Sequence, residues 1–311
     1  DIDSVKSSKT LGSGVPAPML AQKYDPNKIQ NGSKDLRDLK LENQVVCVQD
    51  KLDGNRCLAH LTHDGVKLFT RKGKPFTPLP HIEQQLNATF QQLAQDPKWS
   101  DKLKIDDVWL DGELFTSKYS FNRVNGLLKK QSKSLKDQQV LREIKYYIYD
   151  IVVPGFGYDE RAQQLNYFVS EDVIVVQSTI LQATEEKLQL ALEEALDRGQ
   201  EGLMIRQIDM PYQNKRTWQL MKYKVFEDDE FEIIGFKKAN TGDTLGSAQL
   251  KMKNGKDFFA ALACSDEEQQ QVWDNKDKYL GKMVTVEYFG ISPESEGGKP
   301  RFPKVKGLRI D

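Results

Sequence analysis

The chain has 311 residues, with 45 Lys and Arg against 46 Asp and Glu and a formal net charge of −1. This length suits one large domain plus a small one, and the balanced charge means that any nucleic-acid partner must meet a local basic surface. The sequence holds no apolar run of membrane-spanning length and no charged-then-apolar leader, so we expect no attachment to a membrane.

The first 226 residues are predicted to mix strands with helix. Residues 1–16 are rich in Ser, Gly and Lys, which predicts a flexible N-terminal arm ahead of a first domain at 17–226. Between 181 and 199 the apolar residues take a helical period, with Thr184 as the expected N-cap and Gly199 at the end. Runs of β-branched and aromatic residues predict strands at 45–48, 57–61, 66–70, 108–110, 146–150, 173–176 and 203–206.

The character of the sequence changes after residue 226. Residues 227–230 are all acidic and predict a hinge between two domains. Short strands separated by Gly-containing turns are expected beyond it, at 231–236, 248–253, 258–262 and 283–289. Such a pattern is typical of a small β-barrel, so we expect an α+β first domain followed by a barrel at 227–311.

A charged motif of the form K-x-D-G-x-R spans Lys51 to Arg56. Asp-Gly is a favoured turn dipeptide, so the motif alone is equally consistent with a charged turn that joins strands 45–48 and 57–61 into a hairpin. Five further motifs follow it in order, namely T-R-K-G at 70–73, D-G-E at 111–113, Y-I-Y-D at 147–150, E-G-L-M-I-R at 201–206 and L-M-K-Y-K at 220–224.

The order and spacing of these motifs resemble those of the covalent nucleotidyltransferases, which comprise ATP-dependent DNA ligases, RNA ligases and mRNA capping enzymes. The resemblance covers nearly the whole chain from Met19 onward. It implies an antiparallel α+β adenylation domain followed by an OB-fold barrel, with Lys51 as the nucleophile that carries the nucleotide. A lysine amine can attack the α-phosphate of ATP only when it is neutral, and nearby cations favour that form.

The resemblance also assigns expected roles to other residues. Phosphoryl transfer needs positioning and charge neutralisation, and Mg²⁺ prefers carboxylate ligands. We therefore expect a cationic, phosphate-clamping set, two carboxylates for Mg²⁺, an aspartate that acts on the nick, and an aromatic ring that stacks on adenine. The cationic set is Arg56, Arg71, Lys222 and Lys224, and the two carboxylates are Glu113 and Glu201. The aspartate is Asp53 and the aromatic ring is that of Tyr149.

Each of these residues also has a purely structural interpretation. Tyr149 could be a core aromatic on a strand, and Glu201 a solvated residue after a helix. Lys222 and Lys224 share one face of a strand by period two, which suits a common site but also an ordinary exposed edge strand.

Two short segments favour the DNA ligase branch of the superfamily. The P-M-L-A sequence at residues 18–21 resembles the entry that precedes the lysine in DNA ligases. The segment 300–304, P-R-F-P-K, resembles an element of small viral and bacterial DNA ligases, and by that resemblance Arg301, with Lys304, orients the leaving pyrophosphate. RNA ligases and GTP-using capping enzymes remain the enzymatic alternatives. A nucleic-acid-binding protein with a degenerate transferase domain is the non-enzymatic one.

A small, monomeric, bacteriophage-like ligase is the form that the sequence favours. Its expected partners are ATP, Mg²⁺ and nicked duplex DNA, and the short segment 237–247 leaves no room for an extended DNA-encircling latch. The basic stretch 117–145 is the candidate DNA surface, although a solvated basic helix would look the same. The residues concerned are Lys118, Arg123, Lys129, Lys130, Lys133 and Lys136. The three cysteines show no metal-ligand spacing, so we expect reduced thiols in a cytoplasmic protein.

Overall fold

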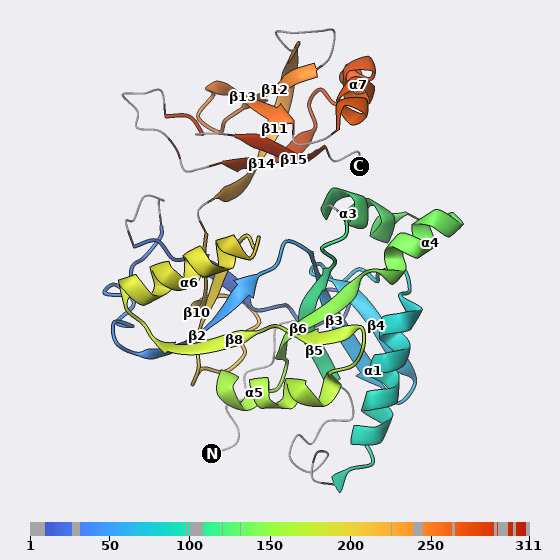
Figure 1. The fold of residues 1–311 in the computed structure, drawn as a ribbon, viewed down its shortest axis with the longest axis vertical. Coiled ribbons are helices and arrows are strands. Elements are labelled where there is room, and N and C mark those ends of the chain that lie inside the picture. The colour runs from blue at the N-terminus through green and yellow to red at the C-terminus, as the bar shows by residue number, and fades with distance from the viewer. Residues whose placement is uncertain are drawn as a thin grey trace. The chain divides into compact units, whose positions relative to one another are not determined.

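The computed structural model describes residues 10–26, 32–97, 99, 108–119, 121–130, 132–224, 226–238, 245–262, 265–288, 291, 298–300 and 303–308. Its contacts divide the chain into two compact units, Asp1–Tyr223 and Lys224–Asp311, which Figure 1 colours from blue to yellow and from orange to red. In the part of the chain that is described, no helix is long and apolar enough to cross a membrane.

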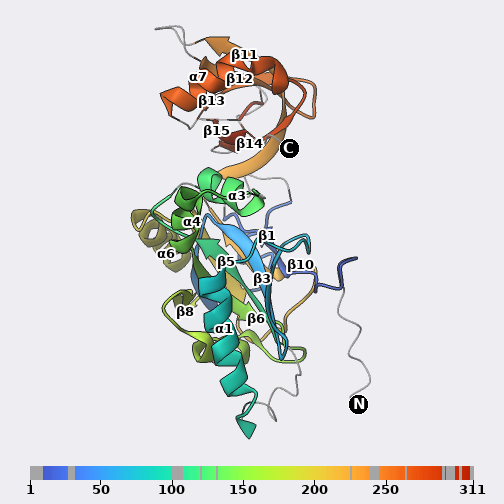
Figure 2. The ribbon, with the colours of Figure 1, turned by 90° about the vertical axis from the view of Figure 1, so that its right-hand side faces the viewer.

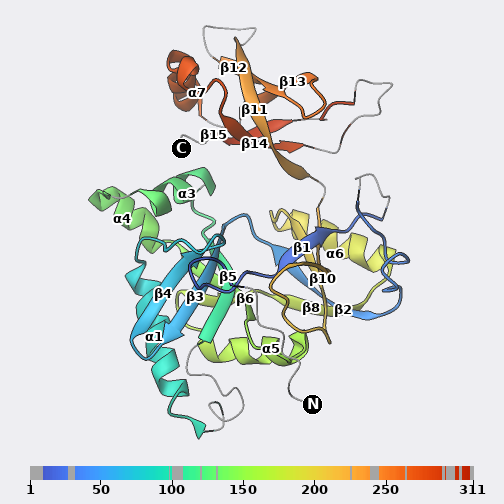
Figure 3. The ribbon, with the colours of Figure 1, turned by 180° about the vertical axis from the view of Figure 1, so that it is seen from behind.

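Two five-stranded sheets form the first unit (Figure 1). The first sheet has the order β1 (Leu20–Lys23), β10 (Arg216–Tyr223), β9 (Gly202–Gln207), β2 (Val45–Lys51), β8 (Ser178–Gln182). The second has the order β4 (Gly65–Thr70), β3 (Asn55–Thr62), β5 (Val108–Phe115), β6 (Lys145–Ile151), β7 (Val173–Val175). β1 lies beside β10 as a parallel edge strand (Figure 3).

Helices bury one stripe each against these sheets. α1 (Pro80–Leu93) lies along β3 and β4, and Figure 2 shows it in front of that sheet, where Ile82, Leu86 and Phe90 recur at helical spacing and enter the core. α5 (Tyr158–Leu165) packs on β6 and continues into a 3₁₀ turn at Asn166–Phe168. α6 (Glu185–Asp197) packs on β9 and β2, and Thr184 caps it as expected. α3 (Phe121–Lys129) and α4 (Leu135–Arg142) pack on each other.

The predicted hairpin between strands 45–48 and 57–61 is wrong. β2 pairs with β8 and β9, whereas β3 pairs with β4 and β5, so the two strands belong to different sheets. Residues 52–54, between the end of β2 and the start of β3, therefore form a crossing from one sheet to the other. Residues 10–16, expected in the flexible arm, form a turn in which Thr10 bridges Pro16 and Val15 is buried. Residues 1–9 lie outside the described part.

The second unit is a closed barrel, as the sequence predicts. Its strand order is β11 (Glu227–Lys238), β12 (Leu245–Lys251), β13 (Asp257–Leu262), β15 (Lys304–Leu308), β14 (Met283–Tyr288). The mixed α+β fold with a following barrel is thereby confirmed. The acidic run 227–230 is not a free hinge, because it begins β11 and pairs residue by residue with β14. The sequence prediction missed β15, the 3₁₀ turn Lys276–Lys278 and α7 (Asp266–Asp274), whose N-cap is Ser265.

Candidate active site

The motif lysine lies where β2 ends against β9. Lys51 stands opposite Gly202 in the register of the two strands, and the backbone N–H of Glu201 donates to the carbonyl of Lys51 at 3.2 Å. The Lys51 ammonium forms an ion pair with the Glu201 carboxylate, whose side chain is only 8% exposed. Long-range strand pairing thus brings together two predicted site residues that are far apart in sequence.

The crossing after Lys51 is closely packed against the second sheet. A Cβ on Gly54 would lie 2.6 Å from the carbonyl oxygen of Leu114 and 2.7 Å from Cγ of Glu113, so only glycine fits there without a shift. Asp53 is exposed, and it lines a small pocket together with Asn55, Phe115 and other residues. The close approach at Gly54 fixes the path by which the chain carries Asp53 past β5.

Arg56 is held rigidly on β3. Its guanidinium donates to both carboxylate oxygens of Asp111, at 2.9 and 2.5 Å, and to the carbonyl of Met19 at 2.7 Å. The Tyr212 hydroxyl donates to the same carboxylate at 2.7 Å. Burial alone would lower the pKa of Arg56, but the Asp111 carboxylate raises it well above its ordinary value, so Arg56 is a fixed positive charge. Asp111, from the D-G-E motif, is therefore the partner that orients Arg56.

Glu113 lies beside the same cations. It faces Arg56 across the strand pair β3–β5, and the Tyr149 hydroxyl donates to its carboxylate at 3.4 Å. Burial raises the pKa of Glu113 to about 8, although the charges of Lys51 and Arg56 oppose this rise and those of Asp111 and Glu201 add to it. Lys51, Arg56, Glu113 and Glu201 thus act on one another within a single site formed where the two sheets meet.

Tyr149 lies at an irregularity in β6. Asp111 pairs with Asp150 while Gly112 pairs with Ile148, so Tyr149 is the extra residue of a β-bulge, a feature that redirects a side chain. Its half-buried ring has the guanidinium carbons of Arg206 and Arg56 at 5.5 and 5.7 Å from its centre. The ring is thus a fixed aromatic group next to the Glu113 carboxylate.

The remaining predicted residues come from β10, the turn after β4 and the second unit. Lys222 is half-buried on β10 opposite Met204, but β10 ends at Tyr223, so the prediction that Lys222 and Lys224 share one strand face is wrong. Lys224 belongs to the second unit, where its ammonium pairs with Asp228 at 2.8 Å and its side chain is 6% exposed. Arg71 is exposed in the turn after β4. Partial burial and the charges of Arg56 and Arg216 lower its pKa while Tyr149 opposes this, so Arg71 lies near enough to act on two residues of the site. Arg301 lies outside the described residues, and Lys304 is exposed on β15.

The Lys51 ammonium has a carboxylate partner, Glu201, and shares the site with the cation Arg56. The wider cationic setting that the sequence suggested stays a prediction. In the parts of the chain that the structure describes, no group of three or more His, Cys, Asp or Glu side chains is placed to hold a metal ion. Glu113 and Glu201 remain as two carboxylates that both interact with the motif lysine.

The basic stretch forms the segment that includes α3 and α4, and part of its charge is neutralised. Lys118 pairs with Glu143 at 2.6 Å and Lys130 pairs with Asp137 at 2.7 Å, while the half-buried Lys133 donates to the carbonyl of Lys130 at 2.8 Å. Arg123, Lys129 and Lys136 are exposed as well, and the Arg123 guanidinium lies over the Tyr119 ring at 4.7 Å from its centre. The segment is therefore an exposed basic region in which part of the charge is paired. That it contacts DNA stays a prediction.

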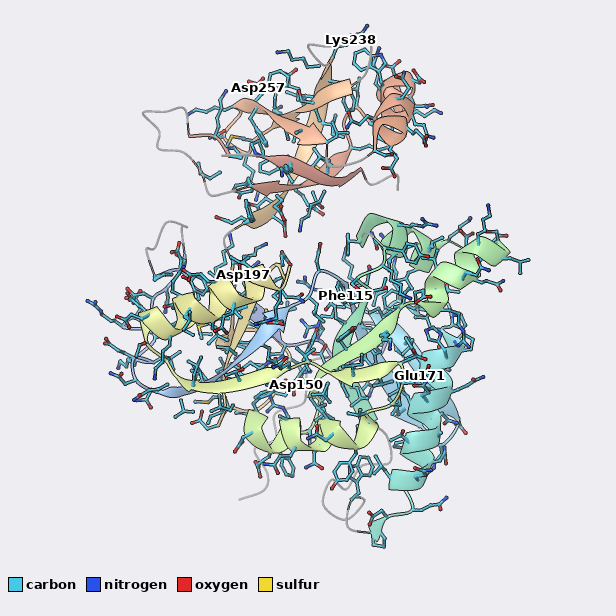
Figure 4. All side chains as sticks on the ribbon, in the orientation of Figure 1. Phe115, Asp150, Glu171, Asp197, Lys238 and Asp257 are labelled. Atoms are coloured by element: carbon cyan, nitrogen blue, oxygen red, sulfur yellow. The ribbon has the colours of Figure 1, made fainter. Side chains whose placement is uncertain are left out.

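Sequence reasoning missed a buried polar network beneath Tyr149. Asp150 is fully buried and accepts hydrogen bonds from Arg161 on α5 and Arg206 on β9. Figure 4 labels Asp150 at its place above α5. Asp150 and Arg206 stand at the ends of two recognised motifs, which was the available signal, whereas nothing in the local sequence marked Arg161.

Comparisons with known proteins agree with this arrangement. The sequence model of a family described as "ATP dependent DNA ligase domain" matches residues 18–224, more than half of the chain, and one described as "DNA ligase OB-like domain" matches residues 238–309. The DNA ligase of Enterobacteria phage T6 is 22% identical over 324 residues, which cover 88% of this chain and 63% of the relative, so the chain spans less than two thirds of that protein.

Solved structures show the same fold at low sequence identity. A mycobacterial DNA ligase D complexed with ATP and MES has a TM-score of 0.58 at 19% identity, over 95% of each chain. The ATP-dependent DNA ligase of bacteriophage T7 in complex with ATP has a TM-score of 0.54 at 17% identity, over 94% of this chain and 98% of that one. These likenesses concern the fold of both units.

Proposed function

Because the chain belongs to the family of ATP-dependent DNA ligases, we propose that it seals nicks in duplex DNA with ATP through a covalent adenylate on Lys51. The observation that carries the proposal is the convergence of Lys51, Glu201, Glu113 and Arg56 at the junction of the two sheets. These four residues come from three separate motifs, and their meeting in one site is what a nucleotidyl transfer to Lys51 requires.

The proposed reaction has three displacements at phosphorus. The Lys51 amine, after losing a proton, forms a bond to the α-phosphorus of ATP, and pyrophosphate leaves. The 5′-phosphate oxygen at the nick then takes the AMP and releases the lysine. Finally the 3′-hydroxyl attacks that 5′-phosphate and AMP leaves, which closes the strand. We assign to Asp53 a role in these later steps on the nick, which its exposure at the crossing supports.

The chain's own residues hold the reactants in this scheme. Arg56 offers a permanent positive charge to phosphate oxygens. Its guanidinium is held in place because two of its N–H groups donate to the two carboxylate oxygens of Asp111. Tyr149 offers a ring face to the adenine. Such positioning and charge neutralisation contribute most of the rate in phosphoryl transfer.

Mg²⁺ fits the donor set at this site. The ion is usually held by one or two carboxylates together with substrate phosphates, and Glu113 and Glu201 supply two carboxylates at the junction. When bound, it would offset the charge of the triphosphate. The exposed basic side chains of the α3–α4 segment are the proposed contacts to DNA phosphates, with the protein acting as a monomer in the cytoplasm.

Two assays test the proposal. The protein is incubated with labelled ATP or GTP and Mg²⁺ and run on a denaturing gel, and it is separately given a nicked duplex whose strands are DNA or RNA. We expect an AMP adduct that Lys51→Ala abolishes and Lys67→Ala, at an exposed position on β4, retains. A GMP adduct would indicate a capping enzyme, and preferential sealing of RNA strands would indicate an RNA ligase. The absence of any adduct would indicate a binding protein. Each of these outcomes would replace the proposal.

A further inference from the structure

A network of buried polar side chains joins the strands that carry the proposed site. Arg206 on β9 is 3% exposed; its Nε donates to Gln49 on β2 at 2.8 Å and its Nη1 donates to Asp150 on β6 at 2.8 Å. The Gln49 amide in turn donates to the Tyr158 hydroxyl at 2.8 Å. β2 ends at Lys51 and β9 begins next to Glu201, so the network ties both to the strand of Tyr149.

The network places two guanidinium groups on one buried carboxylate. Asp150 is already neutralised by Arg161, which donates two hydrogen bonds to it at 2.7 and 3.1 Å and also satisfies the carbonyls of Phe156 and Met210. Arg206 is therefore a second guanidinium on one buried carboxylate. Burying an extra charge is unfavourable unless it has a compensating role, and an apolar side chain of similar size would fill the same space.

The location of Arg206 indicates what that role is. Its guanidinium carbon lies 4.7 Å from the centre of the Tyr158 ring and 5.5 Å from that of the Tyr149 ring, so it bridges the two rings. The Arg161 guanidinium shares the Tyr158 ring, but its other aromatic neighbour is Tyr212. Tyr149 is the extra residue of a bulge, so regular strand pairing does not fix its orientation. Its carbonyl accepts from the Tyr158 hydroxyl at 3.1 Å, which links the backbone of the bulge to the same network.

We propose that Arg206 is a positioning residue that, held by Asp150 and Gln49, fixes the Tyr149 ring as the platform for the nucleobase of ATP. A fixed cation near the ring restricts its rotation through cation–π attraction. A platform held in place before binding costs less to order when the nucleotide arrives. This inference rests on the proposed adenylation and concerns how tightly ATP is held, not whether Lys51 reacts.

The test is the ATP dependence of single-turnover self-adenylation for Arg206→Met. Removal of binding without removal of chemistry raises the half-saturating concentration and leaves the maximal rate constant unchanged. We expect the half-saturating ATP concentration to rise by roughly five- to tenfold, with the maximal rate constant within about twofold of the parent's. Arg206→Lys, which keeps the charge, should restore part of the loss. An unchanged half-saturating concentration in Arg206→Met overturns the inference.

A matched control and a double variant separate positioning from stability. Arg161→Met removes the other guanidinium on Asp150 and should lower the melting temperature without moving the half-saturating ATP concentration. If both arginine variants raise it equally, the network only supports the fold and the inference is wrong. In a Tyr149→Leu background, Arg206→Met should add almost nothing, because the two residues act through one ring. Additive effects would contradict a role through Tyr149.

Two further results keep the inference distinct from the proposed function. If Arg206→Met does not fold, Tyr158→Phe removes the hydroxyl that holds the Tyr149 carbonyl and should raise the half-saturating ATP concentration in the same direction; no change there refutes the positioning network. If the unaltered protein takes up no label at any ATP concentration, the proposed function fails. If the unaltered protein reacts while Arg206→Met and Tyr158→Phe behave like it, only the positioning role fails.

Discussion

Gly54→Ala tests whether the crossing between the sheets sets the geometry of the site. The added methyl group would lie 2.6 Å from the Leu114 carbonyl oxygen and 2.7 Å from Cγ of Glu113, and the first of these contacts is with the backbone of a central strand. The clash must therefore displace residues 52–55 or the Glu113 side chain. Overpacking of this kind costs about 1–3 kcal/mol of stability. A displacement of about 1 Å near reacting groups costs on the order of 100-fold in rate.

Two measurements on purified Gly54→Ala check this reasoning. Thermal unfolding should show a melting temperature lower by a few degrees, and the rate constant of self-adenylation at saturating ATP should fall by about 100-fold. The matched control is Gly126→Ala on α3, where a Cβ meets nothing within 4 Å and where alanine favours the helix. If Gly54→Ala adenylates at the parent's rate and melts at the parent's temperature, the crossing does not constrain the site.

Three further predictions concern charge. Folding raises the pKa of Glu113 from 4.5 to about 8, so between these pH values the folded protein retains a proton that the unfolded chain releases, and this group's contribution to stability falls as the pH rises. Glu113→Gln should therefore melt above the parent at pH 9 but not at pH 5. Equal differences in melting temperature at both pH values would contradict the shift. Asp111→Asn leaves the Arg56 guanidinium without its carboxylate partner and should lower the free energy of unfolding, measured in urea, by about 3 kcal/mol. A loss below about 1 kcal/mol would show that the buried ion pair does not stabilise the fold. A triple variant replaces the exposed Lys129, Lys130 and Lys136 of the α3–α4 segment with Gln. It should bind DNA more weakly, and the slope of log affinity against log salt concentration should become shallower by about 0.9 per lost phosphate contact. The control Lys187→Gln on α6 should bind like the parent, and unchanged affinity of the triple variant would exclude this surface.

The sequence predicted the strands but not all of their partners. Local alternation and β-branched content are enough to locate β2 and β3, and the Thr184 cap is enough to start α6. The hairpin between β2 and β3 was wrong because a turn-like Asp-Gly between two strands carries no information about a second sheet. In the sheet, Lys51 on β2 pairs with Gly202 on β9. A local sequence pattern holds no information about strand pairing between residues so far apart in the chain.

The second unit shows a similar limit. The acidic run 227–230 looks like a linker by composition, yet Glu227 is buried and the whole run pairs with β14. α7 was missed although Ser265 and Glu268 form a capping box, a signal that the sequence does contain. The network around Asp150 could not have been found in this way, because its members come from four separate elements and only the folded chain brings them together.

The spacing of the K-x-D-G-x-R motif has a geometric cause. Lys51 ends a strand of one sheet and Arg56 lies near the start of a strand of the other, so the residues between them must cross a fixed gap. Side chains alternate along β3: Arg56 faces Glu113 in the site, while its neighbour Cys57 is fully buried in the core beneath α1. A shift of one residue would turn Arg56 into that core and expose Cys57 to the site. The spacing is therefore the length of the crossing, and the glycine within it is required because that crossing touches the backbone of β5.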